Sequence, residues 1–214
     1  MQKPRTREPA GPAQPVRARI LGAAFAAFTE QGYAGTTTLD IATRAKVSKR
    51  DLYANFGNKE AMLLACIESR TERMRLPADR PAPHDREGLA ASLTQFGATL
   101  LREGSHPFVV AMFRLAVAEA TRAPEVAHTL EESGRGATRR ALAELLAGAQ
   151  AARLIGAGEP SDMAAQFLPL LWGDLLLNLL LGLAAAPGPA DIAKRAENAA
   201  AAFLRLYPAP AGRK

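Results

Sequence analysis

The side chains best suited to chemistry lie in a short basic stretch between residues 46 and 59. Lys46, Lys49, Arg50 and Lys59 provide four cations there, and Asp51 lies among them. Lysine and arginine bind phosphates or the O6 and N7 atoms of guanine, and aspartate accepts a hydrogen bond from cytosine N4. The stretch therefore indicates contact with a nucleic acid.

Residues typical of catalytic or metal sites are few and scattered. His84, His106 and His128 lack the spacing of metal ligands, and neither a glycine-rich phosphate loop nor a Gly-x-Ser-x-Gly elbow occurs. The single cysteine, Cys66, falls on the expected inner face of a helix, so a structural role is favoured over redox sensing. We predict no catalytic residue, metal or cofactor, and no enzymatic activity.

Two short helices, at about 38–45 and 48–56, must position the basic stretch. Together they have the size of a helix-turn-helix, at about 37–56, with Ala42 small enough for a close helix crossing and Leu52 as an inner anchor. The second helix would present its N-terminal end outward, and a recognition helix uses that end in the major groove. The alternative is a solvated amphipathic helix without a ligand.

The composition predicts an all-α fold. Of 214 residues, 46 are Ala and 28 Leu, whereas only 6 are Val and 5 Ile, and Ala and Leu favour helices. The net charge of +6 is uneven: residues 1–60 carry ten Lys or Arg against five Asp or Glu, and residues 61–214 carry 17 against 16. The positive excess thus accompanies the helix-turn-helix, as contact with a polyanion requires.

The segments 36–42, 45–53 and 56–61 resemble the DNA-binding signature of TetR-type transcriptional regulators. Phe28, Gly32 and Tyr33 fit the same pattern, and the resemblance covers about residues 17–68. It implies an N-terminal three-helix helix-turn-helix domain followed by a helical ligand-binding and dimerisation domain. One departure is Lys46, where the family usually has glycine; a left-handed lysine would cost on the order of 1 kcal/mol.

The resemblance also implies which residues contact DNA. Base edges would be contacted from the start of the second helix, and phosphates by the residues around it. For Tyr53 a buried ring is the alternative, and Asp51 could serve only as the capping-box partner of Ser48. The expected DNA-binding residues are Thr37, Thr38, Lys46, Ser48, Lys49, Arg50, Asp51, Tyr53, Asn55 and Lys59.

Proline-rich breaks divide the chain. The expected parts are a flexible arm at 1–15, the DNA-binding domain at 16–75, a linker at 76–85, a helical domain at 86–207 and a tail at 208–214. Further helices are expected at 86–103, 107–122, 124–132, 137–153, 161–183 and 191–207. Pro169 should kink or split the helix at 161–183.

Dimerisation is predicted from the residues at 168–183, which are apolar on nearly every side. Such a helix needs a second cover, and the run is too short and interrupted to span a membrane. A second subunit is the expected cover, in an interface that also uses the last helix. The candidate interface residues are Leu176, Leu180, Ala196, Ala200 and Phe203.

A small-molecule pocket would be lined by bulky residues of the second domain, each of which could equally be plain core. Asp174 and Asn178, which are spaced i, i+4, could bind a ligand, fix the dimer register or form hydrogen bonds within the subunit. The candidates are Phe96, Phe108, Met112, Phe113, Phe167, Trp172, Asp174 and Asn178.

The sequence thus predicts a cytoplasmic DNA-binding regulator that acts as a homodimer on a pseudo-palindromic duplex operator. Repression is the default that the resemblance implies, with release by a small apolar or aromatic effector. The alternative is a dimeric helical regulator that has no small-molecule ligand. A closed core without a cavity would favour that alternative.

Overall fold

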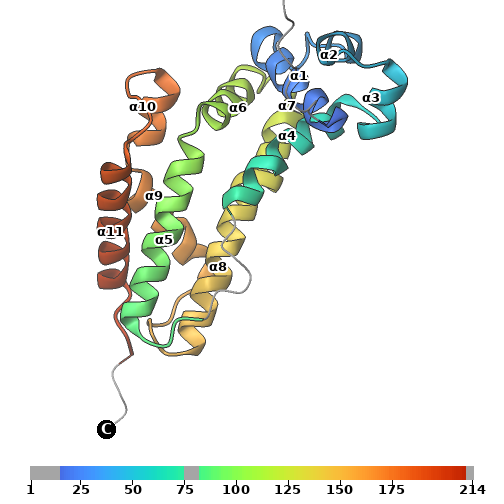
Figure 1. The fold of residues 1–214 in the computed structure, drawn as a ribbon. Helices are drawn as coiled ribbons and strands as arrows, with labels where there is room; N and C mark the ends of the chain where they lie inside the picture. The colour runs from blue at the N-terminus through green and yellow to red at the C-terminus, as the bar shows by residue number, and fades with distance from the viewer. Residues whose placement is uncertain (1–14, 75–81, 211–214) are drawn as a thin grey trace, which may run out of the picture.

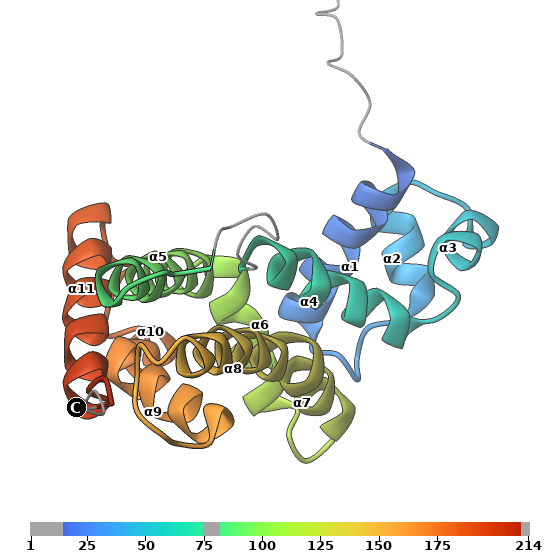
Figure 2. The same ribbon diagram turned by 90° about the horizontal axis from the view of Figure 1, so that it is seen from below.

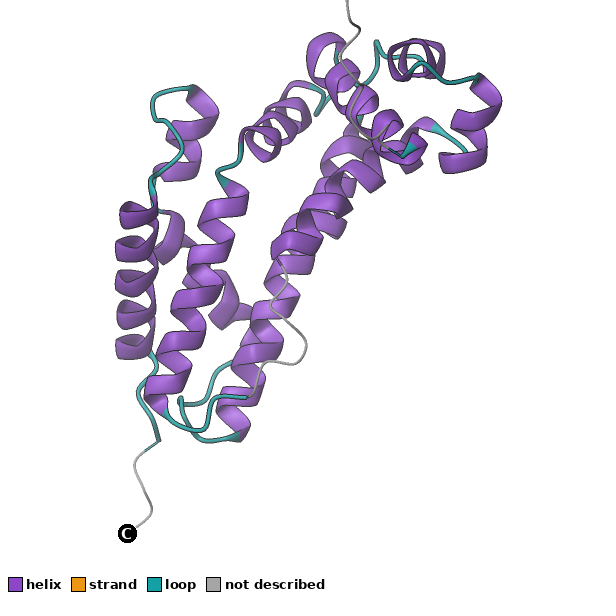
Figure 3. Cartoon of the chain, viewed as in Figure 1, coloured by secondary structure: helices purple, strands orange, loops and turns teal. Residues whose placement is uncertain are grey.

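The computed structural model describes residues 15–74 and 82–210. The predicted arm, except Pro15, most of the predicted linker and the last four residues lie outside these described residues. Within them every regular element is a helix and no strand occurs (Figure 3). The prediction of an all-α fold is confirmed.

Four helices form the N-terminal head (Figure 1): α1 (Val16–Gln31), α2 (Thr38–Ala45), α3 (Lys49–Phe56) and α4 (Lys59–Met74). They surround one apolar core, to which every helix contributes a side chain with no exposed surface. Examples are Ile20, Phe28, Ile41, Leu52 and Met62. This burial fixes which face of α3 remains outside.

The second domain begins after the linker and contains the remaining helices. They are α5 (Arg86–Gly104), α6 (Pro107–Ala118), α7 (Pro124–Leu130), the π-helix η1 (Glu131–Arg135), α8 (Gly136–Ala151), α9 (Pro160–Trp172), α10 (Leu175–Leu181) and α11 (Pro189–Leu206). Four of them start with proline, whose fixed φ and missing N–H suit the first helical position. Viewed from below, α4 lies between helices α1 to α3 of the head and the α5, α9 and α11 side of the second domain (Figure 2).

Two predicted helix boundaries were wrong. The expected helix at 161–183 does break, but at Gly173 rather than at Pro169: Gly173 has φ 46° and ψ −132°, and α9 and α10 meet at 60°. The expected helices at 124–132 and 137–153 are joined by η1 instead of a loop. A Cβ on Gly136 would lie 2.7 Å from the Glu131 carbonyl oxygen, so glycine permits this close turn.

Close packing of α5 and α11 organises the second domain. Gly97 of α5 lets its neighbours approach closely, since a Cβ there would lie 2.9 Å from Leu171 Cδ1 of α9 and 3.4 Å from the Ala196 Cβ of α11. The Arg86 guanidinium donates to the carbonyls of Leu154, Leu204 and Tyr207, which fastens the start of α5 to the end of α11. The two helices therefore form a fixed support for α9 and α10.

No single helix of the described residues has both the length and the apolarity of a membrane span, and α9 with α10 would have them only as a pair bent by 60°.

Candidate nucleic-acid interface

Matching capping boxes start both helices of the helix-turn-helix. Thr37 accepts the backbone N–H of Asp40, whose carboxylate accepts the N–H of Thr37 in return. Ser48 and Asp51 repeat this arrangement at α3. The hydrogen bonds from the Ser48 hydroxyl and backbone lower the pKa of Asp51, as those from Thr37 lower the pKa of Asp40.

The turn between α2 and α3 places Lys46 in the left-handed region. Its φ is 53° and ψ 50°, and its backbone N–H bonds the carbonyls at the end of α2. The conformation that usually requires glycine is therefore adopted by lysine, at a cost of about 1 kcal/mol. Its side chain is exposed beside α3, so the strained residue adds a cation to that surface.

The N-terminal end of α3 faces solvent. Leu52 and Phe56 are buried on its inner side, with 0% and 8% exposure, while Lys49 and Arg50 are exposed. Asp51 is exposed as well, but its carboxylate is bound to Ser48. This geometry favours the capping role that the sequence left open for Asp51, and it presents two unhindered cations.

Tyr53 connects the two helices of the motif. Its ring is 47% exposed, which excludes the buried alternative, and its hydroxyl lies 3.2 Å from Thr38 Oγ1 at the start of α2. Both hydroxyls therefore lie on one side of the head, next to the free N–H groups of the α2 N-terminus. A helix N-terminus with adjacent hydroxyls is suited to a phosphate.

Two predicted phosphate contacts have structural partners inside the head. Lys59 Nζ donates to the carbonyls of Tyr33 and Thr36, at 2.8 and 3.2 Å, and lies 4.3 Å from the Tyr33 ring centre. The Asn55 side chain donates to the Asp51 carbonyl at 2.7 Å. Lys59 thus fastens the α1–α2 loop to α4, and both side chains are half-buried.

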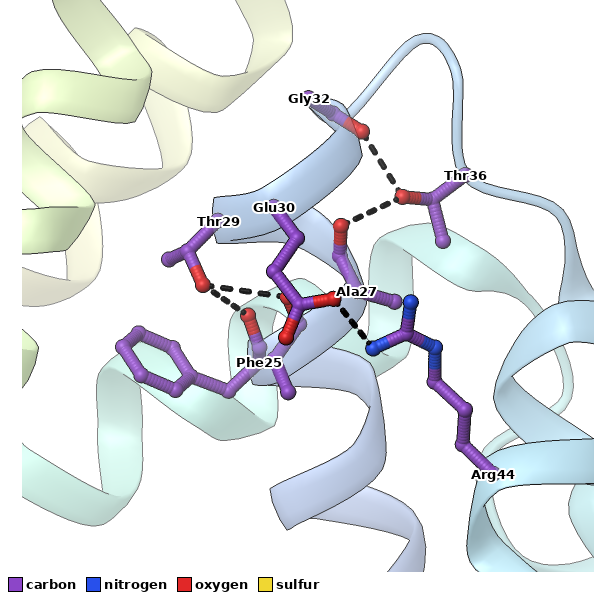
Figure 4. Close-up of polar contacts among 8 residues, drawn as sticks. Phe25, Ala27, Thr29, Glu30, Gly32, Thr36 and Arg44 are labelled. Atoms are coloured by element: carbon purple, nitrogen blue, oxygen red, sulfur yellow. Dashed lines mark hydrogen bonds and ion pairs between the residues drawn. The ribbon is translucent and has the colours of Figure 1, made fainter.

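The end of α1 holds α2 in place (Figure 4). The Thr36 hydroxyl lies 3.1 Å from the Ala27 carbonyl and 2.8 Å from the Gly32 carbonyl, and Arg44 pairs with Glu30 at 2.6 Å. Arg44 is therefore engaged with α1, although its charge counts toward the basic excess of the first 60 residues.

Sequence reasoning missed Arg17 at the edge of this surface. Its guanidinium donates to the Asn55 carbonyl at 3.0 Å and covers the Phe56 ring at 4.4 Å. An exposed arginine in the first turn of α1 gave no spacing signal, because its partners lie 38 and 39 residues away.

Family models match both parts of the chain. The model described as bacterial regulatory proteins, tetR family, matches residues 20–66, and the model described as AefR-like transcriptional repressor, C-terminal domain, matches residues 91–209. The second match alone spans more than half of the 214 residues. The chain belongs to the TetR family. It is accordingly a helix-turn-helix transcriptional regulator of a repressor family and not an enzyme, as predicted.

Individual proteins agree with this assignment. The flavonoid-responsive regulator FrrA is 34% identical, with a TM-score of 0.73, over 92% of this chain and 98% of FrrA. A TetR regulator from Agrobacterium tumefaciens is 28% identical, with a TM-score of 0.73, over 91% of this chain and 95% of its own. HbdR from Aromatoleum sp. (strain CIB) is 43% identical over 53 residues, 25% of this chain. YvkB from Bacillus subtilis is 39% identical over 54 residues, also 25%. These matches span only 23% of HbdR and 29% of YvkB.

A cavity of about 670 Å³ lies between α4 of the head and the helices of the second domain in this TetR-family chain. Helices α4 to α10 contribute to its wall, together with η1. Four of the predicted pocket residues line it, namely Phe108, Met112, Phe113 and Trp172. The arginines Arg70, Arg135 and Arg139 also line it and were not predicted.

The other four pocket candidates lie elsewhere, which corrects their assignment. Phe96 and Phe167 are 2% and 0% exposed and belong to the core between α5, α9 and α11. Asp174 is exposed at the bend before α10. Asn178 is half-buried on α10 and is not among the residues that line the cavity.

The dimer candidates also need correction. Ala196, Ala200 and Phe203 are 0 to 2% exposed because they pack on α5 within their own subunit, and they cannot meet a partner there. Leu176 and Leu180 line the cavity. The face of α11 that was predicted to meet a partner covers the core of its own protomer.

Cys66 is 1% exposed in the core of the head. Burial raises the pKa of its thiol to about 12, so the thiol stays protonated at neutral pH. This favours the structural role. In the described ranges 15–74 and 82–210, no three His, Cys, Asp or Glu side chains are grouped as a metal site.

Proposed function

We propose that the chain represses transcription as a homodimer on a pseudo-palindromic operator and that a small apolar or aromatic effector releases it. One observation carries the effector part of the proposal. The cavity wall includes Phe108, and its ring stacks on Phe25 of α1 with the ring centres 3.6 Å apart. The ligand site and the DNA-binding head thus share a direct contact.

In the proposed complex α3 enters the major groove. Lys49 and Arg50 contact base edges, since both are exposed at its N-terminal end and the Asp51 carboxylate is held by Ser48. Tyr53 and Thr38 contact a phosphate next to the α2 N-terminus. Lys46 adds electrostatic attraction from the turn.

The proposed dimer uses the outer surface of α9 and α10 and the residues that directly follow α10. Of the nine large apolar side chains exposed among the described residues, four lie between residues 170 and 183: Leu170, Leu177, Leu181 and Leu183. Their exposed fractions run from 40 to 74%. An apolar patch of this kind marks an association surface, and a second copy provides the two-fold symmetry of a palindromic operator.

Release follows if the effector displaces Phe108. Ring stacking then transmits the displacement to Phe25, so α1 and the α2–α3 pair that packs on it change position relative to the partner's head. An effector acts only through its different affinity for the two arrangements. The cavity disfavours the ligand-free alternative, and similarity to the flavonoid-responsive FrrA supports an aromatic effector.

The DNA-binding part can be tested without knowing the operator. The wild-type protein first selects its preferred duplexes from a random pool, and affinities are then measured by fluorescence anisotropy. We expect Arg50→Ala to weaken binding by at least about tenfold, because a lost base contact costs about 1–3 kcal/mol. Arg205→Ala, on the exposed side of α11, removes the same charge far from the head and should bind as wild type. Equal affinities for all three proteins would refute the assignment of α3.

A further inference from the structure

The cavity wall carries charge of one sign. Its charged lining residues are Arg70 of α4, Arg135 of η1 and Arg139 of α8, and no Asp or Glu of the described chain lines it. The remaining wall is largely aromatic and aliphatic, with Phe113 and Trp172 among the bulky members. A ligand inside the cavity would therefore contact mostly apolar side chains and, among the charged groups of the described chain, only the guanidinium groups of these arginines.

The carboxylates that accompany these arginines do not neutralise all of them. Arg135 and Arg139 share one partner, Glu131, at 3.2 and 3.1 Å. Arg70 has its own partner in Glu103 at 3.6 Å and also contacts His106 Nε2 at 3.2 Å. One positive charge thus remains in excess at the η1–α8 side of the cavity.

The π-helix η1 and the start of α8 bring the two arginines of this excess charge to the same side of the cavity. Glu131, Arg135 and Arg139 follow one another at intervals of four residues across η1 and the start of α8. Arg135 and Arg139 keep 62% and 43% of their side-chain surface exposed, so their N–H groups can accept a further partner. Two guanidiniums around one carboxylate have more donors than that carboxylate can use.

We propose that the effector is an amphipathic organic anion, with an aromatic or aliphatic body and one carboxylate, phenolate or sulfonate group. The body occupies the apolar wall beside Phe113 and Trp172, and the anionic group binds Arg139 and Arg135. This inference rests on the proposed function, because it takes the cavity as the effector site, and it adds the charge of the ligand.

Three probes that share a body and differ in charge test it: 6-phenylhexanoate, 6-phenylhexan-1-ol and 6-phenylhexylamine. Trp172 is the single tryptophan of the chain and lines the cavity, so its fluorescence reports binding directly, with calorimetry as a second measurement. We expect the acid to bind about tenfold more tightly than the alcohol, as a charge-assisted hydrogen bond would give. The amine should bind most weakly.

Variants locate the anion site. Arg139→Gln and, separately, Arg135→Gln should each lower the affinity for the acid by about fivefold or more and leave the affinity for the alcohol unchanged. A general folding defect would lower both affinities. Arg140→Gln is the matched control: it is next in the chain but bonds the Glu132 carbonyl and does not line the cavity. It should bind all three probes as wild type.

The outcomes separate the two proposals. If the alcohol or the amine binds as tightly as the acid, or if Arg139→Gln and Arg135→Gln lower both acid and alcohol affinity equally, the anion inference is wrong and the cavity remains a ligand site. If none of the three probes binds, the cavity is not an effector site, and the effector part of the proposed function falls together with the inference.

Discussion

At the scale of single residues, hydrogen bonds decide which charged groups of the head are available. Sequence alone left Asp51 either as a base contact or as a cap, and its two bonds to Ser48 show that the carboxylate caps α3. Lysine is a residue type that often contacts phosphate, yet the ammonium group of Lys59 donates to two backbone carbonyls of the head. Residue type and spacing therefore select candidate side chains, whereas the use of each one depends on partners distant in the sequence, which for Lys59 lie 26 residues away.

The capping carboxylates predict an acid-sensitive head. The pKa values of Asp40 and Asp51 are lowered from the ordinary 3.8 in the folded state, so the stabilisation they give is present above pH 3.8 and is lost as pH falls through the folded-state pKa. We expect the thermal midpoint of Asp51→Asn to fall less than that of wild type on acidification below about pH 4. Circular dichroism at several pH values measures this, and parallel curves for the two proteins would contradict it.

Gly32 illustrates a backbone requirement at the end of α1. With φ 79° and ψ 160° it occupies a region essentially reserved for glycine, and a Cβ there would lie 2.4 Å from Glu119 Oε1. Gly32→Ala should reduce the free energy of unfolding by about 1–3 kcal/mol in chemical denaturation. Gly22 lies inside α1 with open space where a Cβ would be, so Gly22→Ala should instead raise the free energy of unfolding by about 0.5–1 kcal/mol. Equal effects of the two variants would show that the conformation of Gly32 imposes no strain.

At the scale of helices, the sequence predicted the helical type of the elements better than the junctions between them. Proline at the first position marked the starts of α6 and α7, and the alanine and leucine content excluded strands. The helical connection between α7 and α8 was not predicted, because Ser133 and Gly134 are typical loop residues but lie within the π-helix η1. The apolar face of α11 was assigned to a partner, since one face of a helix does not reveal which neighbour covers it.

The exposed leucines of α10 give a test of the dimer. Leu177→Arg combined with Leu181→Arg places two charges in the proposed interface, where unpaired charge is strongly unfavourable, and should give monomers in sedimentation velocity. Leu39→Arg changes an equally exposed leucine on the DNA-binding head and should leave the dimer intact. A dimer that persists in the double variant would place the interface on another surface.

At the scale of the whole molecule, the head and the second domain have separate apolar cores, and the cavity lies between them. The head core extends into α6 and α7, including Met112, Leu115 and Val126, while α5, α9 and α11 form a separate core. Helix α6 contributes to both cores, since Val110 packs in the second-domain core while Met112 and Leu115 pack in the head core. The cavity lies between these two cores, a position that no local sequence pattern could predict.

This arrangement predicts a variant in which ligand binding and DNA release are separated. Phe25→Leu removes the ring that stacks on Phe108 but does not alter the cavity wall. We expect probe affinity measured through Trp172 to stay within about twofold of wild type, while the loss of DNA affinity on adding the probe becomes smaller. If the probe releases Phe25→Leu from DNA as fully as wild type, another contact carries the coupling.

The central claim, that two copies of the chain contact DNA through α3, is tested most directly by hydroxyl-radical footprinting on a duplex selected by the protein. The account predicts two protected segments related by two-fold symmetry, with centres about 34–36 Å or a multiple of one helical turn apart. At a protein concentration that just saturates the wild-type footprint, both should weaken together in Arg50→Ala and remain in Arg205→Ala. A single protected segment, or two segments of unchanged strength in Arg50→Ala, would contradict it.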